Sequence, residues 1–221
     1  MSAPLVPVGR ALRLQAAGVL SSRSLLAASA VWLGVLAAVY AADAGPPRQA
    51  MAFTAAVLFA VAAWATAAQL AAGSADLRAV LTAADGRGRV LAADVLLSLV
   101  WVGVATLAGV LAALVFDPHP ASASDIAVGA GLHLACGIAG MALALLLHAA
   151  GMARGMQAAV VVLFGVVSGQ LAALPPIGPV LAAWSSDSDR GTAPAVWSFA
   201  GPVLLAGVFV AATVALRRRR A

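Results

Sequence analysis

Residues 90–116 read VLAADVLLSLVWVGVATLAGVLAALVF, and Asp94 is the only charged side chain in this run. A helix needs about 20 mostly apolar residues to cross the hydrocarbon core of a bilayer. Open β-structure is excluded in lipid, because its backbone groups would lack hydrogen-bond partners. The run is therefore predicted to be a transmembrane α-helix.

Five more runs of this kind are separated from one another by segments rich in Asp, Pro or Gly. Core helices of a soluble protein are a poor alternative, because six such runs follow one another with almost no polar face. We therefore expect an all-α integral membrane protein with one transmembrane domain over residues 1–221. The six predicted spans are residues 25–42, 51–72, 90–116, 126–148, 157–174 and 196–216.

The composition supports a membrane protein. The chain has 221 residues, of which 63% are hydrophobic and 10% are charged, whereas a soluble domain is about 45–50% apolar and about 25% charged. Such a chain cannot cover itself with polar surface, which argues against a soluble enzyme. Because Cys136 is the single cysteine, no intrachain disulfide or cysteine-based zinc cluster can form.

The arginines predict the orientation. With both chain ends in the cytoplasm, the inner segments hold all the arginines except Arg48 and Arg190, as the positive-inside rule requires. The basic tail at 217–221 then anchors at the lipid headgroups. It is weak support for a nucleic-acid patch, so we expect no nucleic-acid partner. The first span is predicted to be retained rather than cleaved as a signal sequence, because arginines precede it and five spans follow.

Three segments outside the spans carry further patterns. Residues 1–23 fit an amphipathic helix in the inner headgroup region, or simply a solvated basic flank. The first inner loop predicts a short helix, capped by Ser74 and ended by Asp85-Gly86, with an apolar stripe at Leu77, Val80, Leu81 and Ala84. This helix is either a docking element for a soluble partner or a turn lying on the membrane. Residues 171–195 predict a broken excursion into the outer leaflet, with Trp184 at the interface.

Together these features resemble the membrane subunit of a type II ABC exporter. The shared pattern is an amphipathic elbow helix, six spans with both termini inside, a short helix between spans two and three, and a partly inserted segment between spans five and six. The most specific stretch, residues 76–89 (DLRAVLTAADGRGR), is similar to the family's coupling helix and the basic turn after it. Many relatives carry a Glu in this helix, whereas this chain contains none. Haem-export permeases have a similar size and topology.

The resemblance implies a permease in the inner cell membrane that exports a lipid-like, drug-like or haem-like substrate. The chain has no Lys and so no Walker A loop. A separate ABC ATPase would therefore bind ATP and magnesium, and this chain would need no cofactor. Two ATPase subunits would lie beneath a permease homodimer or heterodimer, and residues 76–84 would transmit ATP-driven closure into the first and second spans. The implied ATPase-docking residues are Asp76, Leu77, Arg78, Val80, Leu81, Asp85 and Arg87.

The polar residues within the spans are few. They could line a transport pathway or merely hydrogen-bond neighbouring helices, and the candidates are Thr66, Gln69, His133, Ser168 and Gln170. Gly165 and Gly169 have the spacing of a close helix-packing motif. No paired carboxylates, metal-ligand cluster or nucleophile with a base is visible, so we expect no catalytic activity. A secondary transporter or a non-transporting assembly subunit stays an alternative.

Overall fold

The computed structural model describes residues 12, 15–18, 22–42, 46–72, 75–171, 173–184 and 192–219. At residues 75–78, 183–184, 192–197 and 217–219 it describes the backbone alone. All regular secondary structure in these ranges is α-helical, which confirms the predicted all-α class. In chain order the helices are α2 (Arg23–Ala41), α3 (Pro47–Ala72), α4 (Ala75–Asp85), α5 (Arg87–Phe116), α6 (Ala123–Ala149), α7 (Arg154–Gln170), α8 (Gly178–Trp184) and α9 (Thr192–Arg219).

Five helical segments are long and apolar enough to cross a membrane: α2, α3, α5, α6 and the Ser198–Leu216 part of α9. They coincide with five of the six predicted spans, and they give the chain the architecture of a multi-pass membrane protein. Several helices extend beyond the predicted apolar limits; α5, for example, begins at Arg87 rather than at Val90. A basic side chain at the end of a span can continue the helix while its charged group stays in water.

The fifth predicted span, residues 157–174, differs from the structure. Helix α7 begins earlier, at Arg154, and ends at Gln170 after 17 residues, so it is not among the five long apolar helices. Leu171 already has an extended backbone, with φ −106° and ψ 103°, and Pro175-Pro176 follow shortly after. Inside a helix these prolines would remove backbone hydrogen bonds and clash with the carbonyl groups four residues earlier, so the helix ends although the apolar sequence continues.

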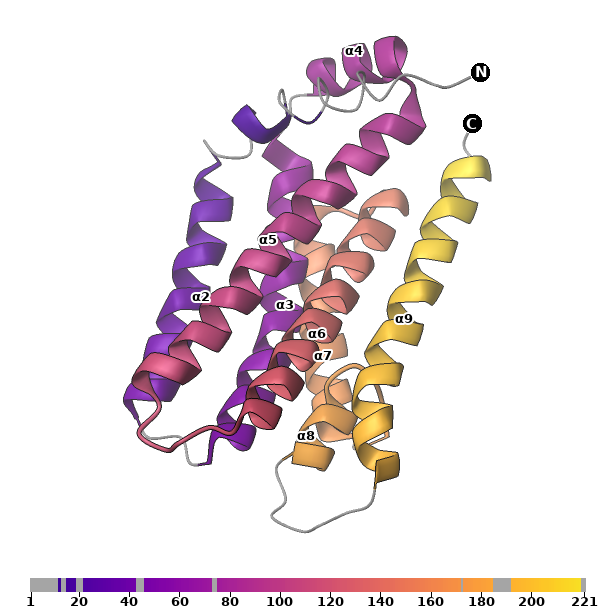
Figure 1. Ribbon diagram of the computed structural model, residues 1–221. Coiled ribbons are helices and arrows are strands. Elements are labelled where there is room, and N and C mark those ends of the chain that lie inside the picture. The colour runs from indigo at the N-terminus through magenta and orange to yellow at the C-terminus, as the bar shows by residue number, and fades with distance from the viewer. Residues whose placement is uncertain are drawn as a thin grey trace, which may run out of the picture.

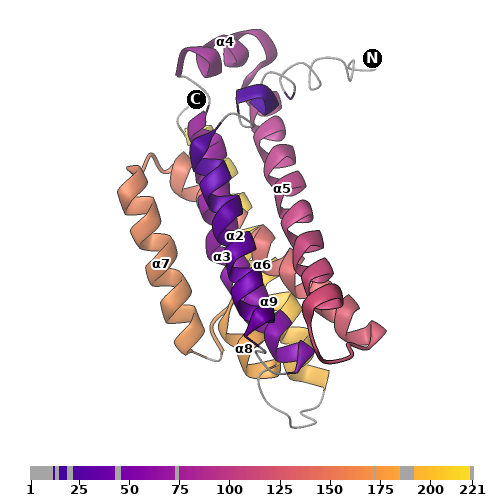
Figure 2. The same cartoon turned by 90° about the vertical axis from the view of Figure 1, so that its left-hand side faces the viewer.

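The helices form a bundle in which α3 and α6 are central. Helices α2 and α5 pack on one side of this pair, α9 packs on α6, and α7 contacts both α3 and α6 (Figures 1 and 2). Helix α4 lies across one end of the bundle, the end at which α2 begins and α9 ends (Figure 1). We call this the α4 end, and we call the opposite end, where α8 and residues 117–122 lie, the α8 end.

The central pair is held together by small residues. A Cβ atom placed on Gly140 of α6 would lie 2.0 Å from the carbonyl oxygen of Phe59 on α3, so the two backbones are in direct contact there. At Gly129 the side chain of Met51 fills the corresponding space. Membrane helices associate through such close packing, because lipid offers no hydrophobic driving force between them.

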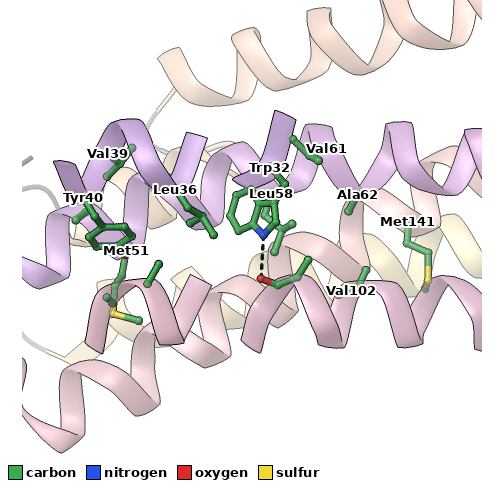
Figure 3. Close-up of a cluster of buried hydrophobic side chains, with 14 of the residues drawn as sticks. Trp32, Leu36, Val39, Tyr40, Met51, Leu58, Val61, Ala62, Val102 and Met141 are labelled. Atoms are coloured by element: carbon green, nitrogen blue, oxygen red, sulfur yellow. Dashed lines mark hydrogen bonds between the residues drawn. The ribbon is translucent and has the colours of Figure 1, made fainter. Parts of the chain in front are cut away.

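The α2 side of the bundle is fixed by larger side chains. Trp32, Leu36 and Tyr40 of α2 are buried against Leu58 of α3 and Val102 of α5. The indole Nε1 of Trp32 donates a hydrogen bond of 3.0 Å to the carbonyl oxygen of Ala105 (Figure 3). This bond gives the polar end of a buried tryptophan its partner.

Small residues are frequent where the central helices meet, and many large apolar side chains face outward. The buried faces of α3 and α6 are rich in alanine and glycine, whereas large apolar side chains are exposed on α5, such as Leu107, Leu111 and Phe116. Exposed apolar side chains also occur along α2, α7 and α9. A surface of this kind is suited to lipid rather than to water.

The segment after α7 is broken, as the prolines predict. Helix α8 packs against α3, α7 and α9 at the α8 end, with Ile177 and Val180 buried. The predicted elbow at 1–23 falls mostly outside the described residues, although residues 12 and 15–18 are helical. In the predicted tail at 217–221, Arg217 to Arg219 continue α9, and the last two residues lie outside the description.

Candidate functional site

Helix α4 occupies the position of the predicted docking helix. It follows α3 and ends where Gly86 takes a φ of +84°, a left-handed conformation that favours glycine. Asp85-Gly86 therefore stops the helix, as predicted. The amide of Gly86 donates to the carbonyl of Thr82, and the amide of Val90 donates back to the carbonyl of Gly86. The corner between α4 and α5 is thus fixed by backbone hydrogen bonds.

The residues of the predicted apolar stripe differ in exposure: one is buried in the bundle and others face outward. The side chain of Leu81 is 3% exposed, whereas that of Val80 is 63% exposed, and Ala84 is also exposed. Since α5 is the main partner of α4, we assign the burial of Leu81 to that contact. The side chains of residues 76–78, which include Asp76, Leu77 and Arg78, lie outside the description. On the described part of α4, Val80 is the large apolar side chain left for a partner.

The charged residues beside α4 are accessible. Arg87 and Arg89 are exposed, and Asp85 is half-buried. The guanidinium of Arg89 donates a hydrogen bond of 3.2 Å to the carbonyl oxygen of Asp85. The surface at α4 thus combines an exposed apolar side chain with exposed arginines.

The predicted pathway residues on α3 lie inside the bundle. Thr66 and Gln69 are buried, and the hydroxyl of Ser98 on α5 donates a hydrogen bond of 2.8 Å to the side-chain oxygen of Gln69. The same hydroxyl lies 3.0 Å from the carbonyl oxygen of Asp94. Gln69 therefore links α3 to α5 close to the α4 end.

His133 of α6 is fully buried and has partners at both ring nitrogens. Its Nδ1 donates a hydrogen bond of 2.7 Å to the carbonyl oxygen of Gly129, and its Nε2 lies 3.0 Å from the hydroxyl of Thr54. The ring of Trp32 meets it edge-on, with the ring centroids 6.0 Å apart. Through these contacts the ring of His133 joins α6 to α3 and α2. This arrangement corresponds to the second alternative given for the polar residues, hydrogen bonding between neighbouring helices.

The remaining predicted residues lie on α7. Ser168 is buried and donates a hydrogen bond of 3.2 Å to the carbonyl oxygen of Gly165 in its own helix, whereas Gln170 is exposed. Gly165 and Gly169 face the side chain of Ile177, at 3.8 and 3.7 Å from their hypothetical Cβ positions. They accommodate a side chain from the segment before α8. The close backbone contact found at Gly140 has no counterpart at either glycine.

A cleft of about 500 Å³ lies between α3 and α7, and the sequence analysis did not identify it. Its walls include the first residues of α2 and the last turns of α6, and none of the five predicted pathway residues lines it. Arg154 and Gln157, near the start of α7, are its most polar lining residues. In the part of the chain that the structure describes, no group of three or more His, Cys or Asp side chains could hold a metal ion.

Comparisons with protein-family models, with curated proteins and with solved structures found no match to this chain.

Proposed function

We propose that this chain is the membrane-spanning permease subunit of an ABC transporter, driven by a separate ATPase that binds at α4. The observation that carries the proposal is α4 itself, an 11-residue helix between the second and third predicted spans that lies across the end of the bundle. Together with exposed Val80 and the neighbouring arginines, it supplies a docking surface outside the spans.

We propose that α7 also crosses the membrane and makes a sixth span. Helix α6 ends at the α4 end and α9 begins at the α8 end, so the chain returns between them through α7 (Figure 2). Its 17 residues correspond to about 25 Å of helix, and spanning helices begin at about 17 residues. Six crossings bring the start of α2 and the end of α9 to the same side of the membrane.

The distribution of charge supports a cytoplasmic α4 end. Arg23, Arg87, Arg89 and Arg154 are all at this end in the fold. At the α8 end the described arginine is Arg48, which pairs with Asp125. The positive-inside rule therefore favours the orientation in which α4 meets soluble partners in the cytoplasm.

The contacts of α4 suggest how movement would enter the membrane domain. The sequence resemblance implies transmission into the first and second spans, but α4 packs mainly on α5, and backbone hydrogen bonds fix its corner with that helix. We therefore propose α5, the third span, as the first helix to respond when ATPase subunits close. A homodimer or a heterodimer with a second permease would supply the second half of the transporter, with an amphipathic molecule as the exported substrate.

The test is to purify the tagged full chain from its native membranes in mild detergent and to identify the proteins that accompany it. We expect a stoichiometric ABC ATPase. The variant V80D should lose the ATPase, because it places a charge in the exposed apolar contact, yet it should stay in the membrane. The matched control is A79D, which adds the same charge at the neighbouring exposed position, away from the stripe, and should retain the ATPase.

Recovery of a folded wild-type chain without any nucleotide-binding subunit would overturn the proposal and favour a secondary carrier or an assembly subunit. Equal ATPase binding by wild type and V80D would reject the docking surface while leaving the transporter class standing.

A further inference from the structure

The cleft between α3 and α7 is polar at one end and apolar along the rest of its length. Its polar residues gather at the α4 end, where α2 and α7 begin. The other lining residues are mostly alanine and valine, with Trp64 on one wall. The full lining consists of Ser22, Ser24, Ala60, Val61, Ala63, Trp64, Ala67, Ala68, Ala71, Ala72, Ala144, Leu147, Arg154, Gln157, Ala158, Val161 and Val162.

The length of the cleft matches one leaflet of a bilayer. On α3 it is lined from Ala60 to Ala72, which corresponds to about 18 Å at a rise of about 1.5 Å per residue. Half of the hydrocarbon core of a bilayer is about 15 Å thick. An acyl chain that enters at the polar end would therefore lie against α3 for the depth of its own leaflet.

The polar end is suited to an anion. Arg154 is exposed, and no described residue forms an ion pair or hydrogen bond with its side chain. Gln157, which is 7% exposed, is held in place by a hydrogen bond of 2.7 Å from its Nε2 to the carbonyl oxygen of Met152. Ala153 caps α7 without a side-chain hydrogen bond, so the amides of the first turn also face this end.

We propose that the cleft binds one anionic membrane phospholipid, with its phosphate at Arg154 and one acyl chain between α3 and α7. Charge complementarity favours this occupant, because an arginine at the mouth of an apolar cleft matches a molecule with a phosphate above a hydrocarbon chain. Its volume of about 500 Å³ lies within the range of about 300–1,000 Å³ that is usual for ligand sites. This inference goes beyond the proposed function and does not depend on an ATPase partner.

The test uses Trp64, which lines the cleft, as a reporter. The purified full chain is reconstituted into phosphatidylcholine vesicles that contain increasing fractions of either brominated phosphatidylglycerol or brominated phosphatidylcholine, whose bromines quench nearby tryptophans. The part of the quenching that disappears in W64F belongs to Trp64. We expect half of the Trp64 quenching at a roughly tenfold lower fraction of brominated phosphatidylglycerol than of brominated phosphatidylcholine. A factor of this size corresponds to the free energy of a hydrogen bond to a charged group.

Two pairs of variants separate the cleft from general effects. In R154Q the two brominated lipids should quench Trp64 equally at equal fractions. R89Q removes a charge at the same end of the bundle but outside the cleft, so it should keep the preference for the anionic lipid. A158F fills the cleft and should reduce quenching of Trp64 by both lipids. A159F adds the same bulk at the adjacent exposed position outside the cleft and should leave quenching unchanged.

Equal quenching of wild-type Trp64 by both lipids would overturn the proposal and show ordinary surrounding lipid only. Equal loss of preference in R154Q and R89Q would also overturn it, since the effect would then come from total charge. Quenching that A158F leaves unchanged would exclude an acyl chain in the cleft. Because these vesicles contain no ATPase, none of these outcomes bears on the proposed function.

Discussion

Replacing Gly140 with alanine is expected to push α3 and α6 apart where their backbones touch. The new Cβ would lie 2.0 Å from the carbonyl oxygen of Phe59 and 3.2 Å from the amide nitrogen of Ala63, and neither helix-backbone atom can rotate away. Ordinary contact begins at 3.4 Å, so the oxygen must move by about 1.4 Å. A radial gap of about 1 Å already forfeits up to roughly half of the dispersion attraction between facing atoms.

The loss of stability can be bounded from these contacts. Overpacking a well-filled interior costs about 1–3 kcal/mol, and the upper end applies at Gly140 because the obstacle is backbone on the central pair of helices. Alanine returns about 1 kcal/mol through its higher helix propensity. The expected net loss is about 2 kcal/mol, or about 30-fold in the unfolding equilibrium.

Cys136 provides the assay. It is the single cysteine of the chain, it is fully buried, and it lies one helical turn before Gly140. When reclosing is fast, the rate at which a maleimide labels it follows the population of the opened state. G140A should therefore label about 30-fold faster than wild type. The matched control is G103A on α5, where a Cβ would meet no atom within 4 Å, and this variant should label no faster than wild type. Labelling of G140A at or below the rate of G103A would refute the close contact between α3 and α6.

Two further predictions use the same labelling rate. H133A should lose about 2–4 kcal/mol, because it opens a cavity in the core. T54V keeps the volume but leaves the buried Nε2 of His133 without a partner, so it should lose about 1–3 kcal/mol; a T54V variant as stable as wild type would contradict the contact between Thr54 and His133. D125A should lose about 1–2 kcal/mol, because it removes both the ion pair with Arg48 and the capping box with Ser122. R48A breaks the same ion pair but leaves the capping box in place, so it should lose less than about 1 kcal/mol; a larger loss in R48A than in D125A would contradict this ranking.

The spans and α4 could be predicted because their signals are local. A long apolar run needs no neighbour to be recognised, and Asp85-Gly86 is itself a helix stop. The predicted limits of α7 were less accurate, because hydropathy shows only how far an apolar run extends. The run continues to Leu174, whereas the helix ends at Gln170. Composition therefore overestimated this helix, because the apolar run extends up to the prolines that end it.

The packing and the cleft could not be predicted in the same way. Gly165 and Gly169 had the expected spacing, yet the close backbone contact is at Gly140, because spacing does not tell which face of a helix meets another helix. The cleft depends on how α3 lies relative to α7, and Arg154 becomes part of it only through that arrangement. The sequence does place Arg154 and Gln157 at the start of an apolar helix, but such a pair does not indicate a cleft by itself.

The size distribution of the bundle also determines how this protein can change over evolutionary time. Positions such as Leu107 and Leu111 are exposed, and wherever such a side chain faces fluid lipid, exchange among leucine, isoleucine and valine should be nearly neutral. At Gly140, by contrast, the backbone of α3 leaves no room for a side chain, and the alanines around this contact are buried. In a library of random variants, the exposed bulky positions should therefore vary freely, whereas Gly140 should be among the most constrained positions.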